Sequence, residues 1–268
     1  MENPTPETKG RDRMKIGFCA KIDRIGEIAG AGYDYIEMPV TAAADWTDEE
    51  FERNLKILQT AGIPAPAFNV LFPGGIALLS PDTKDEVITD YLHRALARVQ
   101  ALGGKTVVFG SGKSRMHPEE VSYDAAFRRL IDVTRLIGDA AAKHDITIVI
   151  EPLNRGETNM INSVAEGACL RAAVNHPNVQ LLADYYHIAL ERHDPADLKR
   201  LGGIAHCHLA TEIGRKAPLE AEPGFSALFS AMKQTGYPGL VSVEGRCDDL
   251  SKDGPATVAL LKRLWEEA

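Results

Sequence analysis

The sequence has few cysteines and no long apolar run. Its four cysteines lie far apart without a CxxC pair, a pattern that favours reduced thiols in a cytoplasmic protein over a disulfide framework. No apolar stretch reaches the roughly 20 residues needed to cross a bilayer. The segment from Met1 to Arg13 is rich in proline and charge and has no apolar core. We therefore expect a flexible tail rather than a signal peptide, with the fold beginning near Met14.

Positive charge is also scarce. Lys and Arg number 30 against 38 Asp and Glu, which gives a formal net charge of −8 and a pI of about 5.5. Nucleic acids and anionic membranes are polyanions, so an acidic protein has no general attraction to them. We expect a small-molecule partner, a sugar or keto-acid, and no nucleic-acid or membrane partner. A homo-oligomer is compatible with the sequence.

The sequence does contain a regular alternation of short and long segments. Short runs rich in Val, Ile and Phe are each followed by a stretch with helical spacing. Strands that alternate with helices form parallel sheets. Eight such units within about 250 residues indicate a closed (β/α)8 barrel, the TIM-barrel fold, rather than an open sheet. We predict a single barrel domain from Met14 to Ala268, with strands at 15–20, 35–40, 66–71, 106–110, 147–151, 179–184, 204–208 and 240–244.

Several helices carry end signals. Thr47 and Glu50 form a capping-box pattern before a helix over 48–61, and Gly62 suits the position after its end. Further helices are expected over 82–102, 123–144, 225–235 and 255–267. The apolar pattern of the last helix predicts a core or subunit contact.

Ligand-type side chains end four successive strands, where a buried apolar run should simply stop. They are Glu151, Asp184, His208 and Glu244. The carboxyl ends of barrel strands meet at one rim, so we expect the four to lie together. Three carboxylates so close would raise one another's pKa unless a cation neutralised them. Three oxygen donors with one imidazole favour Mn²⁺, Mg²⁺ or Co²⁺ over a structural Zn²⁺ site. The alternative is four isolated polar residues facing solvent.

Other polar residues allow two interpretations each. His206 lies on the same side of its strand as His208, either as a substrate contact or as a hydrogen-bonded interior histidine. Glu37, at the end of the second strand, either holds a substrate hydroxyl or orients a neighbour. The run from Phe109 to Arg115 looks like a phosphate loop but lacks the GxxxxGK[ST] spacing. Its Lys113 and Arg115 either bind a substrate anion or are solvated.

At this point the sequence resembles a known family, the xylose-isomerase-like barrel superfamily of sugar isomerases and epimerases. The nearest branch is that of the ketose 3-epimerases and hydroxypyruvate isomerases, and the resemblance spans the chain from Met14. Four segments carry it in order: Glu151-Pro-Leu-Asn-Arg-Gly-Glu157, Asp184-Tyr-Tyr-His187, His206-Cys-His208 with Gly214-Arg215, and Val243-Glu244.

The resemblance implies a ligand set for one divalent metal ion, with Mn²⁺ expected first and Mg²⁺ or Co²⁺ as alternatives. The implied ligands are Glu151, Asp184, His208 and Glu244. It further implies that Glu157, His187 and Arg215 contact substrate oxygens. The sequence departs from the family at Tyr185, where small residues are common, and the loop from Leu209 to Arg215 is spaced more like that of hydroxypyruvate isomerases. The substrate therefore stays open.

This site predicts proton transfer next to a carbonyl. A metal ion that binds a carbonyl and the adjacent hydroxyl stabilises an enediolate, and Glu151 and Glu244 are suitable acid–base groups. If both act, the result is epimerisation. If one acts and the proton moves to the neighbouring carbon, the result is aldose–ketose isomerisation. We predict a metal-dependent sugar isomerase or epimerase.

Three other functions compete with this prediction. A metal-dependent lyase of the same fold would dehydrate inosose-type ketones or cleave 3-keto-glycosides. A non-catalytic barrel would bind a ligand without metal. An endonuclease for abasic DNA would need more metal-binding histidines and a basic face, which the charge of −8 disfavours.

Overall fold

Eight parallel strands close into a barrel. The computed structural model describes residues 14–237 and 239–268, so the predicted tail of residues 1–13 lies outside the described part. The strands follow one another in order, and β1 pairs with β8. This confirms the predicted (β/α)8 fold. Their bounds are β1 (Lys15–Cys19), β2 (Tyr35–Pro39), β3 (Ala67–Asn69), β4 (Thr106–Phe109), β5 (Thr147–Ile150), β6 (Val179–Asp184), β7 (His206–Leu209) and β8 (Leu240–Val243).

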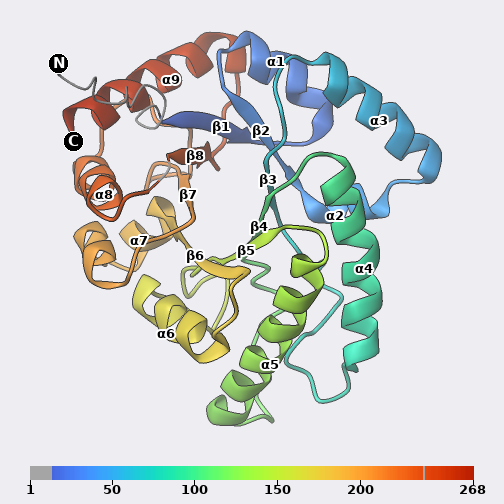
Figure 1. Cartoon of the computed structure of the whole chain (residues 1–268). Coiled ribbons are helices and arrows are strands. Elements are labelled where there is room, and N and C mark those ends of the chain that lie inside the picture. The colour runs from blue at the N-terminus through green and yellow to red at the C-terminus, as the bar shows by residue number, and fades with distance from the viewer. Residues whose placement is uncertain (1–13, 238) are drawn as a thin grey trace, which may run out of the picture.

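The helices form a ring around the barrel (Figure 1). Large apolar side chains such as Phe18, Ile36 and Phe225 fill the space between strands and helices and are almost completely buried. No helix in the described ranges is both long and apolar enough to cross a membrane. The helices are η1 (Ile22–Arg24), α1 (Ile25–Gly30), α2 (Val40–Asp45), α3 (Asp48–Thr60), α4 (Asp85–Ala101), α5 (Tyr123–Ala142), α6 (Val164–Val174), α7 (Tyr185–Leu190), η2 (Pro195–Arg200), α8 (Pro223–Gln234) and α9 (Leu250–Glu267).

Local signals explain where α3 and α9 begin. The backbone N–H of Glu50 donates to Thr47 Oγ1 at 3.2 Å and that of Thr47 to Glu50 Oε2 at 2.8 Å, which confirms the capping box. The predicted start of the last helix at 255 is wrong, because α9 begins at Leu250. Asp249 caps that earlier turn by accepting from the N–H groups of Ser251 and Lys252. Pro255 lies inside α9, where it removes one backbone hydrogen bond, and it does not set the boundary of the helix.

The period of two along each strand decides what lines the barrel interior. Val149 and Leu182 lie two residues before Glu151 and Asp184 and belong to a separate apolar cluster with Val108. On the other side of the barrel the corresponding residues are polar. His206 precedes His208, Ser242 precedes Glu244, and Tyr35 precedes Glu37. The interior side chains just beneath the carboxyl rim are therefore apolar on β5 and β6, and polar and hydrogen-bonded on β7, β8 and β2.

Candidate active site

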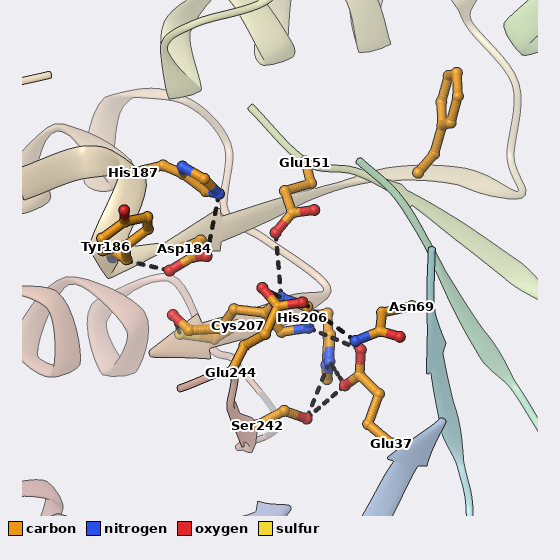
Figure 2. A network of polar contacts seen from close by, with 12 residues as sticks. Glu37, Asn69, Glu151, Asp184, Tyr186, His187, His206, Cys207, Ser242 and Glu244 are labelled. Atoms are coloured by element: carbon orange, nitrogen blue, oxygen red, sulfur yellow. Dashed lines mark hydrogen bonds and ion pairs between the residues drawn. The ribbon is translucent and has the colours of Figure 1, made fainter. Parts of the chain in front are cut away.

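The four side chains predicted as metal ligands gather at the carboxyl rim of the barrel. Glu151, Asp184, His208 and Glu244 each offer one donor atom, and these atoms all lie within 4.8 Å of one another. Figure 2 shows Glu151, Asp184 and Glu244 directed into one space. Asp184 and His208 are register partners on β6 and β7. The barrel thus brings together four residues that span almost a hundred positions of sequence.

Asp184 has its two carboxylate oxygens in different environments. It is both the last residue of β6 and the N-cap of α7, and its Oδ1 accepts a 2.8 Å hydrogen bond from the N–H of Tyr186. The cap orients the carboxylate, because a helix start offers unpaired N–H donors. The other oxygen, Oδ2, is buried and has no hydrogen-bond partner among the residues that the structure describes. A buried carboxylate oxygen without a donor is the group that a cation would satisfy.

His208 has a carboxylate near each ring nitrogen. Its Nδ1 lies 3.1 Å from Glu151 Oε1 and 3.3 Å from Glu244 Oε2, so Nδ1 faces the cluster. Its Nε2 lies 2.8 Å from Glu37 Oε1. Burial lowers the pKa of His208, but Glu37 and Glu244 outweigh burial and raise it well above its ordinary value. Glu37 thus determines which nitrogen is presented to the cluster.

Glu37 and His206 lie beneath the cluster rather than on its open side. Both are completely buried, and His206 Nε2 lies 2.7 Å from Glu37 Oε2. Ser242 Oγ donates to the same Glu37 oxygen at 2.5 Å and also lies 2.8 Å from the Tyr35 hydroxyl. This arrangement fits the second interpretation of each residue, an interior histidine and a carboxylate that orients a neighbour. A substrate contact by either residue stays a prediction.

Arg215 joins the cluster to the substrate side of the rim. Its guanidinium donates to Glu244 Oε2 at 2.6 Å and to Glu157 Oε1 at 3.1 Å, and its charge lies 3.8 Å from Asp184 Oδ2. It also stacks over the Tyr186 ring at 4.7 Å. Its backbone is left-handed, with φ of 48°. Strain of this kind in a non-glycine residue is common at functional sites.

His187 presents an N–H to the same space. The backbone N–H of Asn154 donates to His187 Nδ1 at 3.1 Å, and Asn154 Nδ2 lies 2.8 Å from the same nitrogen. With Nδ1 occupied as an acceptor, the ring hydrogen sits on Nε2. That nitrogen is buried, lies 3.5 Å from Asp184 Oδ2 and has no hydrogen-bond partner in the described part of the chain. Burial, helped by Arg215, lowers the pKa of His187 to about 3, so the ring is a neutral donor at pH 7.

The positive charges of His208 and Arg215 do not bring all three carboxylates of the cluster into their ionised form. Burial, together with Glu151 and Glu244, raises the pKa of Asp184 to about 7. Burial also raises the pKa of Glu151. Burial favours the neutral form of Glu244 too, but His208 and Arg215 outweigh it and lower that pKa to about 2. A divalent cation would favour the ionised forms of Asp184 and Glu151 beside the ionised Glu244. The donor set therefore fits a hard divalent metal ion.

Comparison with known proteins identifies the family of this barrel. The family model described as xylose isomerase-like TIM barrel matches residues 25–265. The chain belongs to this family. Membership of the xylose isomerase-like family confirms the resemblance predicted from the motifs.

Individual relatives in the family are epimerases by name. An L-ribulose 3-epimerase of Methylomonas sp. (strain DH-1) is 28% identical over 256 residues, covering 91% of this chain and 85% of that protein. A 3-dehydro-D-guloside 4-epimerase of Escherichia coli (strain K12) is 29% identical over 168 residues, and the match spans only 62% of that protein. These names agree with the predicted class of enzyme, the isomerases.

Solved structures share the fold. A crystal structure of D-psicose 3-epimerase with D-fructose has a TM-score of 0.77 at 22% identity, covering 95% of this chain and 96% of that one. A D-allulose 3-epimerase from Methylomonas sp. in complex with D-allulose has a TM-score of 0.81 at 22% identity, covering 94% and 97%.

Some residues of the site were not expected from the sequence. Asn154 lies within the Glu-Pro-Leu-Asn-Arg motif but had no assigned contact. The sequence also did not indicate the 3.2 Å hydrogen bond that Asn69, at the end of β3, donates to Glu244 Oε1. The position of Ser242, two residues before Glu244, did indicate that its side chain lies on the same side of β8 as that of Glu244. Both interpretations of Arg115, a substrate anion site and a solvated charge, are wrong, because its side chain is completely buried and its guanidinium donates to backbone carbonyl oxygens. Lys113 is exposed, and its role stays open.

Proposed function

We propose that this protein is a metal-dependent epimerase of a neutral ketose or a closely related α-hydroxyketone. The observation that carries the proposal is the placement of Glu151 and Glu244. They extend from β5 and β8, strands that are not neighbours. Their carboxylate oxygens both lie close to His208 Nδ1, at 3.1 Å for Glu151 and 3.3 Å for Glu244. Two carboxylates that approach one centre from different strands suit removal of a proton from one face of a carbon and its return on the other. The names of the relatives support the same reaction class.

Glu151, Asp184, His208 through Nδ1, and Glu244 would hold the metal ion. When bound, such an ion draws electron density from a carbonyl and an adjacent hydroxyl and so favours the enediolate. The identity of the metal, with Mn²⁺ as our first choice, belongs to this proposal.

The protein side chains bind and orient the substrate and move the proton. Arg215 and the Nε2–H of His187 are donors for substrate oxygens, and Glu157 is an acceptor for a hydroxyl. Glu151 and Glu244 are the two groups that exchange a proton with the carbon next to the carbonyl. Carboxylates in this role contribute typically about 10²–10⁴-fold in rate.

The charges around the site favour a substrate without phosphate or carboxylate. Arg215 is already paired with Glu157 and Glu244, and Arg155 with Glu191. The guanidinium of Arg115 is bound to backbone carbonyl oxygens. The positive charges nearest the three acidic ligands are thus already paired, and a divalent cation would leave little attraction for an anion. Hydroxyl groups match the donors and acceptors that remain.

Isotope exchange tests this function directly. The protein with Mn²⁺ is incubated in D₂O with D-fructose, D-allulose, D-tagatose, L-ribulose and a 3-keto-glucoside, and the products are followed by NMR and chromatography. We expect deuterium at a carbon next to the carbonyl together with a new epimer. Exchange in none of these compounds would contradict the proposal.

Variants test whether both glutamates are needed for the reaction. Glu151→Gln and Glu244→Gln are each expected to lower epimerisation by about 10²-fold or more, whereas Glu120→Gln, an exposed glutamate on the loop after β4, is expected to match the wild type. The same assays detect the lyase alternative, which would release an unsaturated ketone or a free aglycone instead of an epimer.

A further inference from the structure

The loop after β4, residues 110–115, is the segment whose composition looks like a phosphate loop. Its charged end is turned into the protein. Arg115 is completely buried, and its guanidinium donates to the carbonyl oxygens of Phe109 at 3.0 Å and Glu151 at 2.6 Å. The guanidinium also lies over the Phe109 ring at 5.8 Å. The buried guanidinium therefore holds the backbone of Glu151, a residue of the candidate active site.

Gly110 lies directly against the carboxylate of Glu151. A β-carbon at position 110 would come within 2.1 Å of Glu151 Oε2 and 3.2 Å of its Cδ. The backbone of Gly110 is not among those with positive φ, so space rather than backbone conformation requires glycine here. The side chain of Glu151 therefore occupies the volume that any larger residue at 110 would fill.

Gly112 makes the same kind of contact with the other end of the Glu151–Glu157 segment. A β-carbon at position 112 would lie 2.6 Å from the carbonyl oxygen of Glu157 and 3.0 Å from Leu153 Cδ1. The obstacle here is backbone, which cannot move aside as a side-chain tip can. The loop after β4 thus touches the segment at both glutamates that we assign to the site.

We propose that residues 110–115 form a positioning cradle for Glu151 and Glu157. Gly110 and Gly112 leave the space that the Glu151 carboxylate and the Glu157 backbone occupy, and Arg115 fixes the backbone of Glu151. These are positioning residues, since none of them is placed against substrate. The inference rests on the proposed function only for its consequence, the affinity for metal, and not for the geometry of the cradle.

The variant Gly110→Ala separates positioning from folding. The new methyl group collides with the far end of a flexible side chain, so the carboxylate can swing away at little cost to the fold. Oε2 must move from 2.1 Å to beyond about 3.0 Å from the new carbon. Gly75→Ala is the matched control, because a β-carbon at this exposed loop glycine would meet no described residue within 4 Å.

Two measurements test whether residues 110–115 position Glu151. Crystal structures of metal-free Gly110→Ala and Gly75→Ala are expected to show the Glu151 carboxylate displaced in the first variant alone, with Asp184 and Glu244 in place. Calorimetric titration with Mn²⁺ is expected to give an affinity about 10–100-fold weaker for Gly110→Ala, as for loss of groups that orient metal ligands, and wild-type affinity for Gly75→Ala.

An undisplaced Glu151 carboxylate in Gly110→Ala would overturn the cradle, and so would wild-type Mn²⁺ affinity despite a displaced carboxylate. If the wild-type protein bound no Mn²⁺, the proposed function would fail, and the crystal structures alone would decide whether the cradle positions Glu151.

Discussion

Glu37 illustrates how a single buried residue controls the candidate metal centre without being part of it. Its carboxylate is completely buried, yet burial is outweighed by His208 and His206, which lower its pKa far below the ordinary range. A buried charge is tolerated only when its partners are well placed. Glu37 accepts from His208 Nε2 and so leaves Nδ1 directed at the acidic ligands. It is the carboxylate of a carboxylate–histidine pair of the kind that orients metal-binding imidazoles.

Glu37→Gln is therefore expected to weaken Mn²⁺ binding by about 10–100-fold. Glutamine keeps the size of the side chain, but one of the two oxygens that accept separately from His206 and His208 becomes an NH₂ group. Calorimetric titration measures the affinity. Asp145→Asn, which removes one exposed acid near Lys105, is the control for the change in net charge. Equal affinity for Glu37→Gln and wild type would show that His208 needs no such partner.

At the scale of elements, the segment after β5 and helix α7 form one unit. Asn154 links them, because its Nδ2 contacts both His187 Nδ1 and Glu157 Oε1. Asn154→Ala removes these contacts while the backbone N–H still bonds to His187. A neutral hydrogen bond contributes about 1 kcal/mol, so we expect KM for the ketose to rise about 5–10-fold with a smaller fall in kcat. Steady-state kinetics measure both constants.

Asn159→Ala is the control for that variant, since Asn159 lies on the same loop and its side chain, within the described residues, bonds to the backbone of His117 instead of to His187 or Glu157. A fall in kcat without a change in KM would indicate that Asn154 acts on the proton transfer and not on substrate binding.

The elements also show what a sequence can and cannot predict. Alternating strands and helices predicted the barrel, and the rule that strand ends share a rim predicted that Glu151 and Glu244 would meet. Helix α7 was not predicted, because it starts at Tyr185, directly after the last residue of β6, without a connecting loop. The contacts of Glu37 with His206 cross the barrel between strands far apart in sequence, and Arg115 binds backbone oxygens that carry no side-chain signal. Such contacts follow from barrel closure and not from local pattern.

At the scale of the whole molecule, protons and metal ions compete for the same site. An aspartate in an unfolded chain has a pKa of about 3.9, whereas burial and the neighbouring glutamates raise that of Asp184 to about 7 in the folded protein. Between these values the folded state holds a proton that the unfolded state has lost. The contribution of Asp184 to the stability of the metal-free protein is therefore greatest at acid pH and declines as pH rises towards 7.

Metal binding must displace that proton, because a coordinating carboxylate is ionised. We expect the affinity for Mn²⁺ to fall about tenfold per pH unit below 7 for each proton released. The rise in Tm caused by Mn²⁺ should accordingly be larger at pH 8 than at pH 6, as measured by scanning calorimetry with excess metal. Asp184→Asn removes this titrating group, so its weaker Mn²⁺ binding should vary less with pH. A pH-independent affinity in the wild type would mean that Asp184 is already ionised before the metal ion binds, and so that His208 and Arg215 outweigh its burial in solution.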